Sequence, residues 1–299
     1  MTQNMETNSN RSNAWIPWAF VLLWSTGFIG AKLGLPFIGP FTFLAIRMGL
    51  TLLCFGALIA CFRPAWPDLA AARHQWACGA MLHGLYLGAS FAGIKLAVPA
   101  GITALIVGLQ PILTAVLSWL MGEQRLSRMQ WLGLATGFGG ALLVVLGGKG
   151  LQLGANPGLW LTALALCAIT AGTLYQKRFG QGVHPLTGAF HQYLAAFLIT
   201  GALALGLERG DPVHWNGQLA LALGWSVLAL SVLAILLLMR MLKDGEVSKV
   251  ASYFYLTPGL AAVQAWWLFD EQLSLLAVAG MLLAALGVAL VLQRLRWRR

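Results

Sequence analysis

The stretch LQPILTAVLSWLMGEQRLS, residues 109–127, returns later in the chain as LTPGLAAVQAWWLFDEQLS, residues 256–274. The echo lies 147 residues downstream, so Pro111 falls on Pro258. A Glu-Gln pair follows in both copies after a one-residue slip. A repeat this long covers half a chain, and it predicts one module of roughly 145 residues that has been duplicated.

The composition places the chain in a lipid bilayer. Hydrophobic residues make up 59% and charged residues 9% of the sequence, and the mean hydropathy is +0.76. A water-soluble domain carries about a quarter charged residues. Because about 20 apolar residues cross the hydrocarbon core, we expect an all-α integral membrane protein with ten transmembrane helices. The expected spans are residues 15–33, 40–62, 74–94, 98–121, 129–147, 158–176, 185–207, 219–241, 247–269 and 273–293.

Ten spans give each repeat five, and an odd number inverts the second copy relative to the first. The first part of each half agrees at an offset of 145 residues, which places Lys32 on Lys177 and Arg47 on Gln192. The expected division is a flexible cytoplasmic N-terminal tail (1–14), a first five-span repeat (15–147), a linker (148–157), a second five-span repeat (158–293) and a basic cytoplasmic tail (294–299).

The basic residues predict the orientation, because cytoplasmic loops hold an excess of Lys and Arg. With the N-terminus inside, fourteen of the nineteen lie in inner segments, and the outer loops hold only Lys32, Lys95, Lys149 and Arg209. Both termini are therefore expected in the cytoplasm, and the chain is expected to be a multi-pass protein of the inner or plasma membrane. The formal charge of +10 then reflects contact with anionic lipid on the cytoplasmic side, with no nucleic-acid partner.

Arg47 is the only charged residue well inside an expected span. An arginine at the bilayer centre costs at least about 2.5–3.5 kcal/mol, which makes it a functional-site hypothesis. It lies seven residues after the start of its span, so its side chain could instead reach outward to carbonyl groups or lipid headgroups. Both a solute-binding or gating role and a structural role stay open.

His83, Tyr86 and Ser90 follow one helical face of the third span, at i, i+3 and i+7. A single buried histidine is usually a satisfied core residue, whereas a stripe of three polar residues in a membrane favours the border of a cavity. Only His83 and His191 could titrate near neutral pH inside the membrane. Both the core and the cavity interpretation remain at this point.

The repeated fourth and ninth spans form the expected centre. Ala100, Ala104 and Gly108 recur at i, i+4 and i+8, a spacing that lets another backbone approach closely. Pro111 and Pro258 each remove one intrahelical hydrogen bond and bend their spans. Equivalent prolines in inverted halves indicate the pseudosymmetric centre and a hinge, although each proline alone also fits a packing kink.

Five further residues complete the predicted substrate-binding set: Trp24, Gln192, Trp225, Ser252 and Tyr255. With the third-span residues they offer flat aromatic walls and uncharged polar groups, a lining that suits a neutral or zwitterionic amphiphile better than a polyanion. Amino acids, with aromatic and large apolar ones leading, therefore head the expected solutes; nucleosides and uncharged drugs are the alternative.

Small residues also mark the fifth and tenth spans. Gly133 with Gly137, and Gly280 with Ala284, have the small-xxx-small spacing of packing faces. Such a face serves either the fold or a dimer, so we expect a monomer or a weak homodimer.

Enzyme chemistry is not expected. All nine acidic residues lie in loops or tails, and neither paired carboxylates nor an HExxH motif occurs. The four cysteines lack metal-ligand spacing. We therefore expect no catalytic residue, no metal and no cofactor.

The chain resembles the EamA family of the drug/metabolite transporter superfamily over nearly its whole length. The residues that carry the resemblance are Trp24-Ser25-Thr26 with Phe28, Pro40, Arg47, the segments 100–111 and 247–258, and the Glu-Gln turns with the spaced glycines after them. The resemblance implies ten spans in two five-span repeats, and a secondary carrier that most often exports amino acids or related metabolites from a site near mid-membrane.

The mode of transport expected from this resemblance is alternating access. Small multidrug resistance proteins of the same superfamily use an acidic residue in their first span, and this first span has none. Facilitated diffusion or weak proton linkage is therefore expected. A non-transporting membrane receptor or structural protein is the alternative from a different class.

Overall fold

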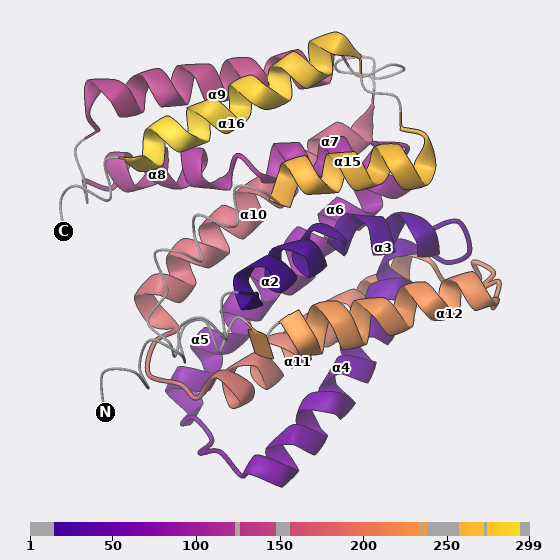
Figure 1. The fold of residues 1–299 in the computed structure, drawn as a ribbon. Coiled ribbons are helices and arrows are strands. Elements are labelled where there is room, and N and C mark those ends of the chain that lie inside the picture. The colour runs from indigo at the N-terminus through magenta and orange to yellow at the C-terminus, as the bar shows by residue number, and fades with distance from the viewer. Residues whose placement is uncertain are drawn as a thin grey trace, which may run out of the picture.

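The computed structural model describes residues 15–122, 126–147, 156–234, 236–237, 257–271 and 274–293. Every regular element in these ranges is a helix (Figure 1). In chain order they are α2 (Ile16–Ser25), α3 (Gly27–Gly34), α4 (Pro40–Phe62), α5 (Leu69–Gly79), η1 (Ala80–Leu85), α6 (Tyr86–Lys95), α7 (Ala100–Val107), α8 (Gln110–Leu120), α9 (Arg128–Gly147), α10 (Pro157–Phe179), α11 (Pro185–Leu207), α12 (Gly217–Gly224), η2 (Trp225–Leu233), α15 (Thr257–Phe269) and α16 (Leu275–Gln293).

Each of the ten expected spans contains helix within the described residues. In the part of the chain that the structure describes, six helical stretches are long and apolar enough to cross a membrane: Ile16–Gly34, Pro40–Phe62, Leu69–Lys95, Ala100–Leu120, Pro157–Phe179 and Pro185–Leu207. The prediction of an all-helical membrane protein is confirmed. The orientation of the termini and the inverted topology stay predictions.

Local chemistry sets where the long helices begin. Proline is the first residue of α4, α10 and α11, where its missing N–H removes no intrahelical bond. Asn156 accepts a hydrogen bond from the Gly158 N–H at 2.8 Å and caps α10. Gln130 and Ser127 bond each other's backbone N–H groups at 2.9 and 3.3 Å before α9, which is a capping box.

Within the described residues, four spans depart from a regular α-helix. The first is broken at Thr26 and the fourth at Gly108 and Leu109. The third and eighth contain the π-helices η1 and η2, whose first residues, Ala80 and Trp225, lie at the repeat offset of 145 residues. Short π-helical segments are rare and occur frequently at functional sites. The π-helices therefore recur at equivalent places in the two halves of the chain, whereas the break at Thr26 has no counterpart in α10.

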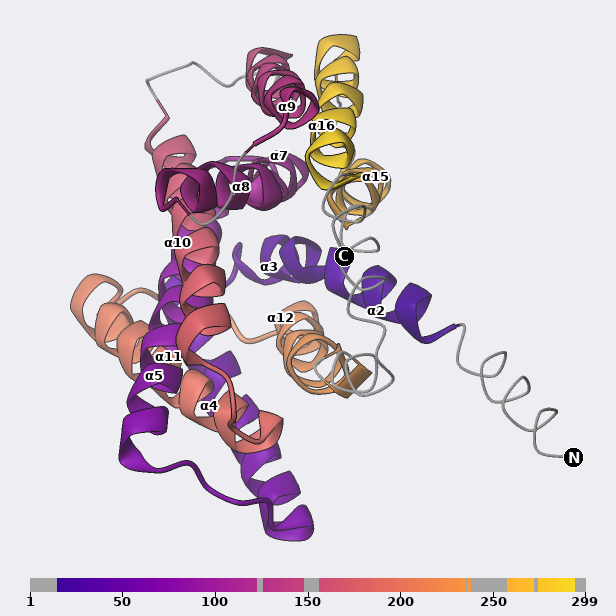
Figure 2. The same cartoon turned by 90° about the vertical axis from the view of Figure 1, so that its left-hand side faces the viewer.

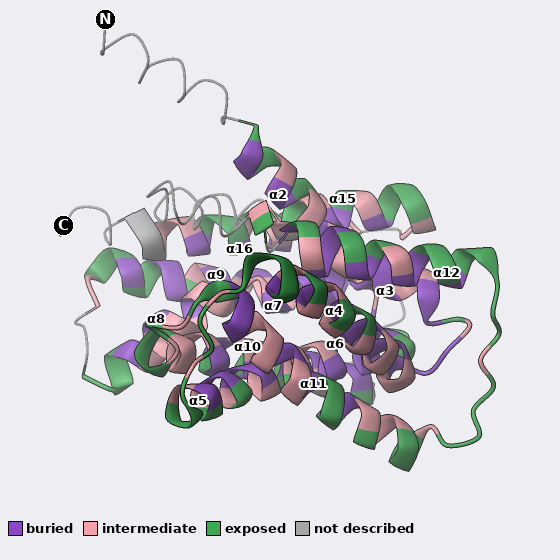
Figure 3. Cartoon of the chain, turned by 90° about the horizontal axis from the view of Figure 1, so that it is seen from below, coloured by how far each residue is buried: buried purple, intermediate pink, exposed green. Residues whose placement is uncertain are grey.

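Helices of the first repeat pack against helices of the second. The contacting pairs are α4 with α11, α5 and α6 with α10, α3 with α12, α7 with α15, and α9 with α16. Figures 1 and 2 both show α9 and α16 side by side at one edge of the molecule. Seen from below, exposed residues follow the outer sides of peripheral helices such as α11 and α12 (Figure 3). Several of these exposed residues are large and apolar, including Leu205 and Leu221, as expected for surfaces that face lipid.

The glycine faces of α9 and α16 meet each other. A Cβ atom added at Gly140 would lie 2.6 Å from the Gly280 carbonyl oxygen, and one at Gly287 would lie 2.3 Å from the Gly137 nitrogen. The two backbones are therefore in direct contact. The small residues of these two helices therefore serve packing within the chain, and the faces that they form are not free for a dimer contact.

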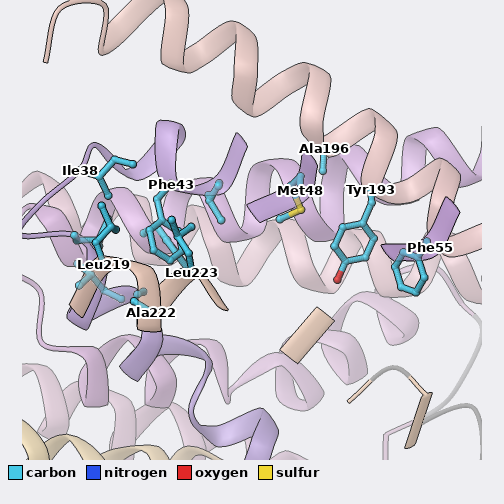
Figure 4. Close-up of a cluster of buried hydrophobic side chains, with 14 of the residues drawn as sticks. Ile38, Phe43, Met48, Phe55, Tyr193, Ala196, Leu219, Ala222 and Leu223 are labelled. Atoms are coloured by element: carbon cyan, nitrogen blue, oxygen red, sulfur yellow. The ribbon is translucent and has the colours of Figure 1, made fainter. Parts of the chain in front are cut away.

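The largest core cluster lies between α4, α11 and α12. Phe43, Met48 and Phe55 of α4 are fully buried and pack with Tyr193 of α11 and Leu219 of α12 (Figure 4). This core fixes α4 against α11, and it thereby positions the polar side chains that these two helices carry.

Candidate functional site

Arg47 is buried inside the helix bundle. It lies in the second turn of α4, is 6% exposed, and donates from Nε to the Ser231 hydroxyl of η2 at 3.2 Å. The side chain thus points into the protein and does not reach outward to lipid headgroups. Among the residues that the structure describes, no carboxylate forms an ion pair with it. A buried charge without a counter-ion is strongly unfavourable, so this guanidinium is the clearest sign of a ligand site.

His83 and Tyr86 lie beside this guanidinium. The His83 ring stacks on Tyr193 of α11, with ring centroids 4.6 Å apart. His83 and Tyr86 are both close enough to Arg47 to interact with it electrostatically. Tyr86 also meets Phe28 edge to face at 6.5 Å. The π-helix η1 ends between these two residues, at Leu85.

Gln192 joins the same group from α11. It donates from Nε2 to the Gln75 Oε1 at 2.7 Å, and Gln75 donates to the Gly180 carbonyl oxygen at 3.1 Å. Gln192 also interacts with His83. We name Arg47, Gln75, His83, Tyr86, Gln192, Tyr193 and Ser231 the polar cluster. It joins spans 2, 3, 7 and 8, and so combines both repeats.

Three members of the polar cluster are absent from the substrate-binding residues that the sequence predicts. Tyr193 directly follows Gln192, so the run of polar residues in span 7 is the sequence feature that could have identified it. Gln75 lies near the start of the third span, where a polar residue fits an ordinary helix end. Ser231 is one hydroxyl among several in span 8. Only the packing of α5, α11 and η2 shows that these three belong together.

Two predicted aromatic residues lie at the break of the first span. Trp225 donates from its indole nitrogen to the Thr26 hydroxyl at 2.8 Å and is 41% exposed. Trp24 is half-buried, and its ring lies 5.4 Å from that of Phe20. Trp225 is therefore held toward α2 and α3, while Ser231, on the same π-helix, contacts Arg47.

Ser90 is fully buried on α6, and its hydroxyl has no hydrogen-bond partner among the described residues. The Ser226 hydroxyl of η2 is in the same state. Buried hydroxyls usually find a partner, so these two are open to a bound water or solute.

The fourth span breaks where the small residues and the proline meet. α7 ends at Val107, Gly108 donates to the Ala104 carbonyl at 2.8 Å, and α8 begins at Gln110. Pro111 lies in the first turn of α8, where it interrupts nothing. The predicted bend is thus a complete break. Pro258 has the equivalent place, second in α15, and Ser252 and Tyr255 lie outside the described residues.

The described residues contain no group of three or more His, Cys, Asp or Glu that could hold a metal ion. The donor groups of the polar cluster are instead a guanidinium, amides, hydroxyls and an imidazole, which are groups able to form hydrogen bonds.

Comparison with known families decides the class of this protein. The EamA-like transporter family matches residues 13–146 and again residues 156–293, one copy in each half. The chain belongs to the EamA-like transporter family. This EamA-family protein is a multi-pass membrane transporter and not an enzyme.

Similar proteins span its full length. It is 27% identical over 278 residues to the uncharacterized transporter YvbV of Bacillus subtilis, covering 91% of this chain and 88% of that protein. It is 24% identical to a probable amino-acid metabolite efflux pump of Salmonella typhimurium, covering 97% and 98%. A crystal structure of another protein matches with a TM-score of 0.64 at 20% identity over 97% of this chain and 99% of that chain, which shows a shared fold.

Proposed function

We propose that this EamA-family transporter exports amino acids or related small metabolites across the inner membrane by alternating access. Two full-length relatives bear the name probable amino-acid metabolite efflux pump. The observation that carries the proposal is the buried Arg47 guanidinium, which has no carboxylate partner among the described residues. A solute carboxylate would supply that partner.

The geometry leaves Arg47 able to bind such a group. A guanidinium carries five N–H donors in a planar fork that matches a carboxylate, and the hydrogen bond to Ser231 uses only Nε. Charge-assisted bonds of this kind are roughly twice as strong as neutral ones. One guanidinium pairs with one carboxylate group, so a solute with a single carboxylate, such as an amino acid, fits this donor better than a phosphorylated solute with two negative charges.

The other residues of the polar cluster would recognise the rest of the solute. His83, Tyr86 and Gln192 provide uncharged polar atoms, and the Tyr86 and Phe28 rings provide apolar surface. This environment favours aromatic and large apolar side chains. The expected carrier works by facilitated diffusion or with weak proton linkage, because the first span offers no carboxylate.

A second candidate function is export of nucleosides or uncharged drugs. The uncharged members of the polar cluster favour it, since they would bind such solutes without any charge on the ligand. In that case Arg47 would act only through Ser231 and its neighbours. Membership of a transporter family sets the receptor and structural alternatives aside.

The test is a competition panel in proteoliposomes that contain the full chain and transport labelled L-phenylalanine. Unlabelled phenylalanine should compete, and its amide, which lacks the carboxylate, should compete at least about tenfold more weakly, because a charge-assisted hydrogen bond contributes about 1.5–3 kcal/mol. Arg47→Met should remove this discrimination and Arg47→Lys should keep part of it. Equal competition by acid and amide, or a preference for uridine or phosphorylated solutes, contradicts the proposal.

A further inference from the structure

The break in the first span leaves α3 as a separate short helix. α2 ends at Ser25, and the Thr26 hydroxyl folds back onto the Leu23 carbonyl at 2.6 Å. Two side chains of the second repeat hold the break: Trp225 donates to Thr26 at 2.8 Å, and Gln264 donates to the Ser25 hydroxyl at 2.9 Å. The position of α3 is therefore set by the one-residue turn at Thr26 that joins it to α2 and by contacts at both of its ends.

The other end of α3 is held by an ion pair. The Lys32 ammonium contacts the carboxylate of Glu271, two residues after the end of α15. The same ammonium lies 4.6 Å from the centre of the Phe269 ring, at the last residue of α15. The same carboxylate accepts hydrogen bonds from the Ala100 and Gly101 N–H groups at 3.0 and 3.2 Å. These N–H groups open α7, where a negative charge is favoured. One carboxylate thus joins α3, α7 and the end of α15.

Glu208 provides an internal comparison. Its carboxylate also caps a helix of the other repeat, accepting from the Phe41 N–H at 2.9 Å and from the Thr42 N–H and hydroxyl, both at 2.7 Å. It forms no ion pair with any described residue. The helix it caps, α4, packs along α11, so this contact reinforces an interface that is already closed. The contact at Glu271 differs because it adds a cation from the short, separately held α3.

The exposure of the pair is compatible with reversible opening. The Lys32 side chain is 30% exposed and that of Glu271 is 9% exposed. Water can therefore compete with Glu271 for the Lys32 ammonium, although it reaches the carboxylate far less. The carboxylate retains its bonds to α7 when the ammonium leaves. Separation of α3 from α7 therefore removes the counter-ion of Glu271 but leaves its carboxylate hydrogen-bonded to the first two N–H groups of α7.

We propose that Lys32 and Glu271 form a gate of the transporter. Their ion pair holds α3 against the start of α7 at the outer end of the solute path, where outer and inner are assigned from the distribution of basic residues. The ion pair breaks when the outer end of the path opens. The gate acts on any solute, so it stands independently of the amino-acid specificity.

Ser90 offers a reporter below this gate. It lies on α6 five residues before Lys95, about 7.5 Å along the helix axis, and α6 packs against both α3 and α7. Ser90→Cys replaces a buried hydroxyl that makes no hydrogen bond. Native Cys78 is fully buried on α5 and serves as a reporter of the intact fold. The other three cysteines are replaced by alanine.

The experiment measures the rate at which a maleimide labels Ser90→Cys in the full chain in nanodiscs, with peptide mass spectrometry to separate it from Cys78. Lys32→Met and Glu271→Gln should each raise the rate at least about tenfold by shifting the population toward the open state, while Cys78 stays unlabelled. The matched control Glu208→Gln should leave the rate unchanged. An unchanged rate in both gate variants, an equal rise in Glu208→Gln, or labelling of Cys78 together with Ser90→Cys overturns the gate.

Discussion

Gly140→Ala should destabilise the protein, whereas the same change at the neighbouring Gly139 should not. A Cβ atom at Gly140 would lie 2.3 Å from the Ala284 nitrogen and 2.6 Å from the Gly280 carbonyl oxygen. Both are backbone atoms and cannot rotate away. At Gly139 the nearest atom is the Leu283 Cδ2 at 3.9 Å, an ordinary contact.

The magnitude follows from these distances. To restore contact at 3.4 Å, α9 and α16 must separate by about 1 Å at Gly140, and overpacking of this kind costs about 1–3 kcal/mol. Replacing glycine by alanine within a helix otherwise stabilises it by about 0.5–1 kcal/mol, which is the expected effect at Gly139. Because the same gain applies at Gly140, it cancels in the comparison, and the two variants should differ by about 1–3 kcal/mol.

Thermal unfolding in detergent measures this difference. For soluble chains of 150–250 residues, 1 kcal/mol shifts the midpoint by about 2–4 °C, so the Gly140→Ala midpoint should lie at least about 2 °C below that of Gly139→Ala. Transport per folded molecule should be equal in the two variants, because the polar cluster contains no residue of α9 or α16. Equal midpoints, or a lower midpoint for Gly139→Ala, would refute direct backbone contact between these helices.

Three further substitutions test other parts of the structure. Gly108→Leu should block transport with little change in thermal stability, because it adds bulk at the break between α7 and α8; a loss of stability in parallel with activity would show that Gly108 serves packing alone. Gly79→Ala should reduce transport, because its Cβ would lie 2.1 Å from the Gln192 carbonyl oxygen and displace the polar cluster; Gly56→Ala, with no atom within 4 Å, is the control and should transport normally. Asn156→Ala should lower the stability by about 1 kcal/mol through loss of the α10 cap, and an unchanged unfolding midpoint would argue against that hydrogen bond.

Some of the candidate site could be predicted from the sequence. Arg47, His83, Tyr86 and Gln192 were identified one by one as polar residues in apolar spans, and the structure brings these four together. Tyr193 and Gln75 were missed because each has an ordinary explanation within its own span. Their place in the polar cluster depends on which helix lies opposite, and the residues next to them in the sequence do not indicate this.

The sequence by itself determined that the chain lies in a lipid bilayer, that it is an all-helical membrane protein, and that it contains an internal repeat. Each depends on sums over local residues: about 20 apolar residues cross a bilayer wherever they occur, and a repeat is visible without any fold. The small residues of the fifth and tenth spans likewise predicted close helix packing, because glycine lets two helix backbones come into contact.

The tertiary structure alone decided the contacts that join distant spans. Lys32 and Glu271 are separated by 239 positions. At the break of the first span, Trp225 and Gln264 donate hydrogen bonds to the Thr26 and Ser25 hydroxyls from 199 and 239 positions away. Nothing near Lys32 in the sequence indicates its partner. The physical reason is that a hydrogen bond or ion pair between two helices requires one rotation and one axial register of each, and these follow from the packing of the whole bundle.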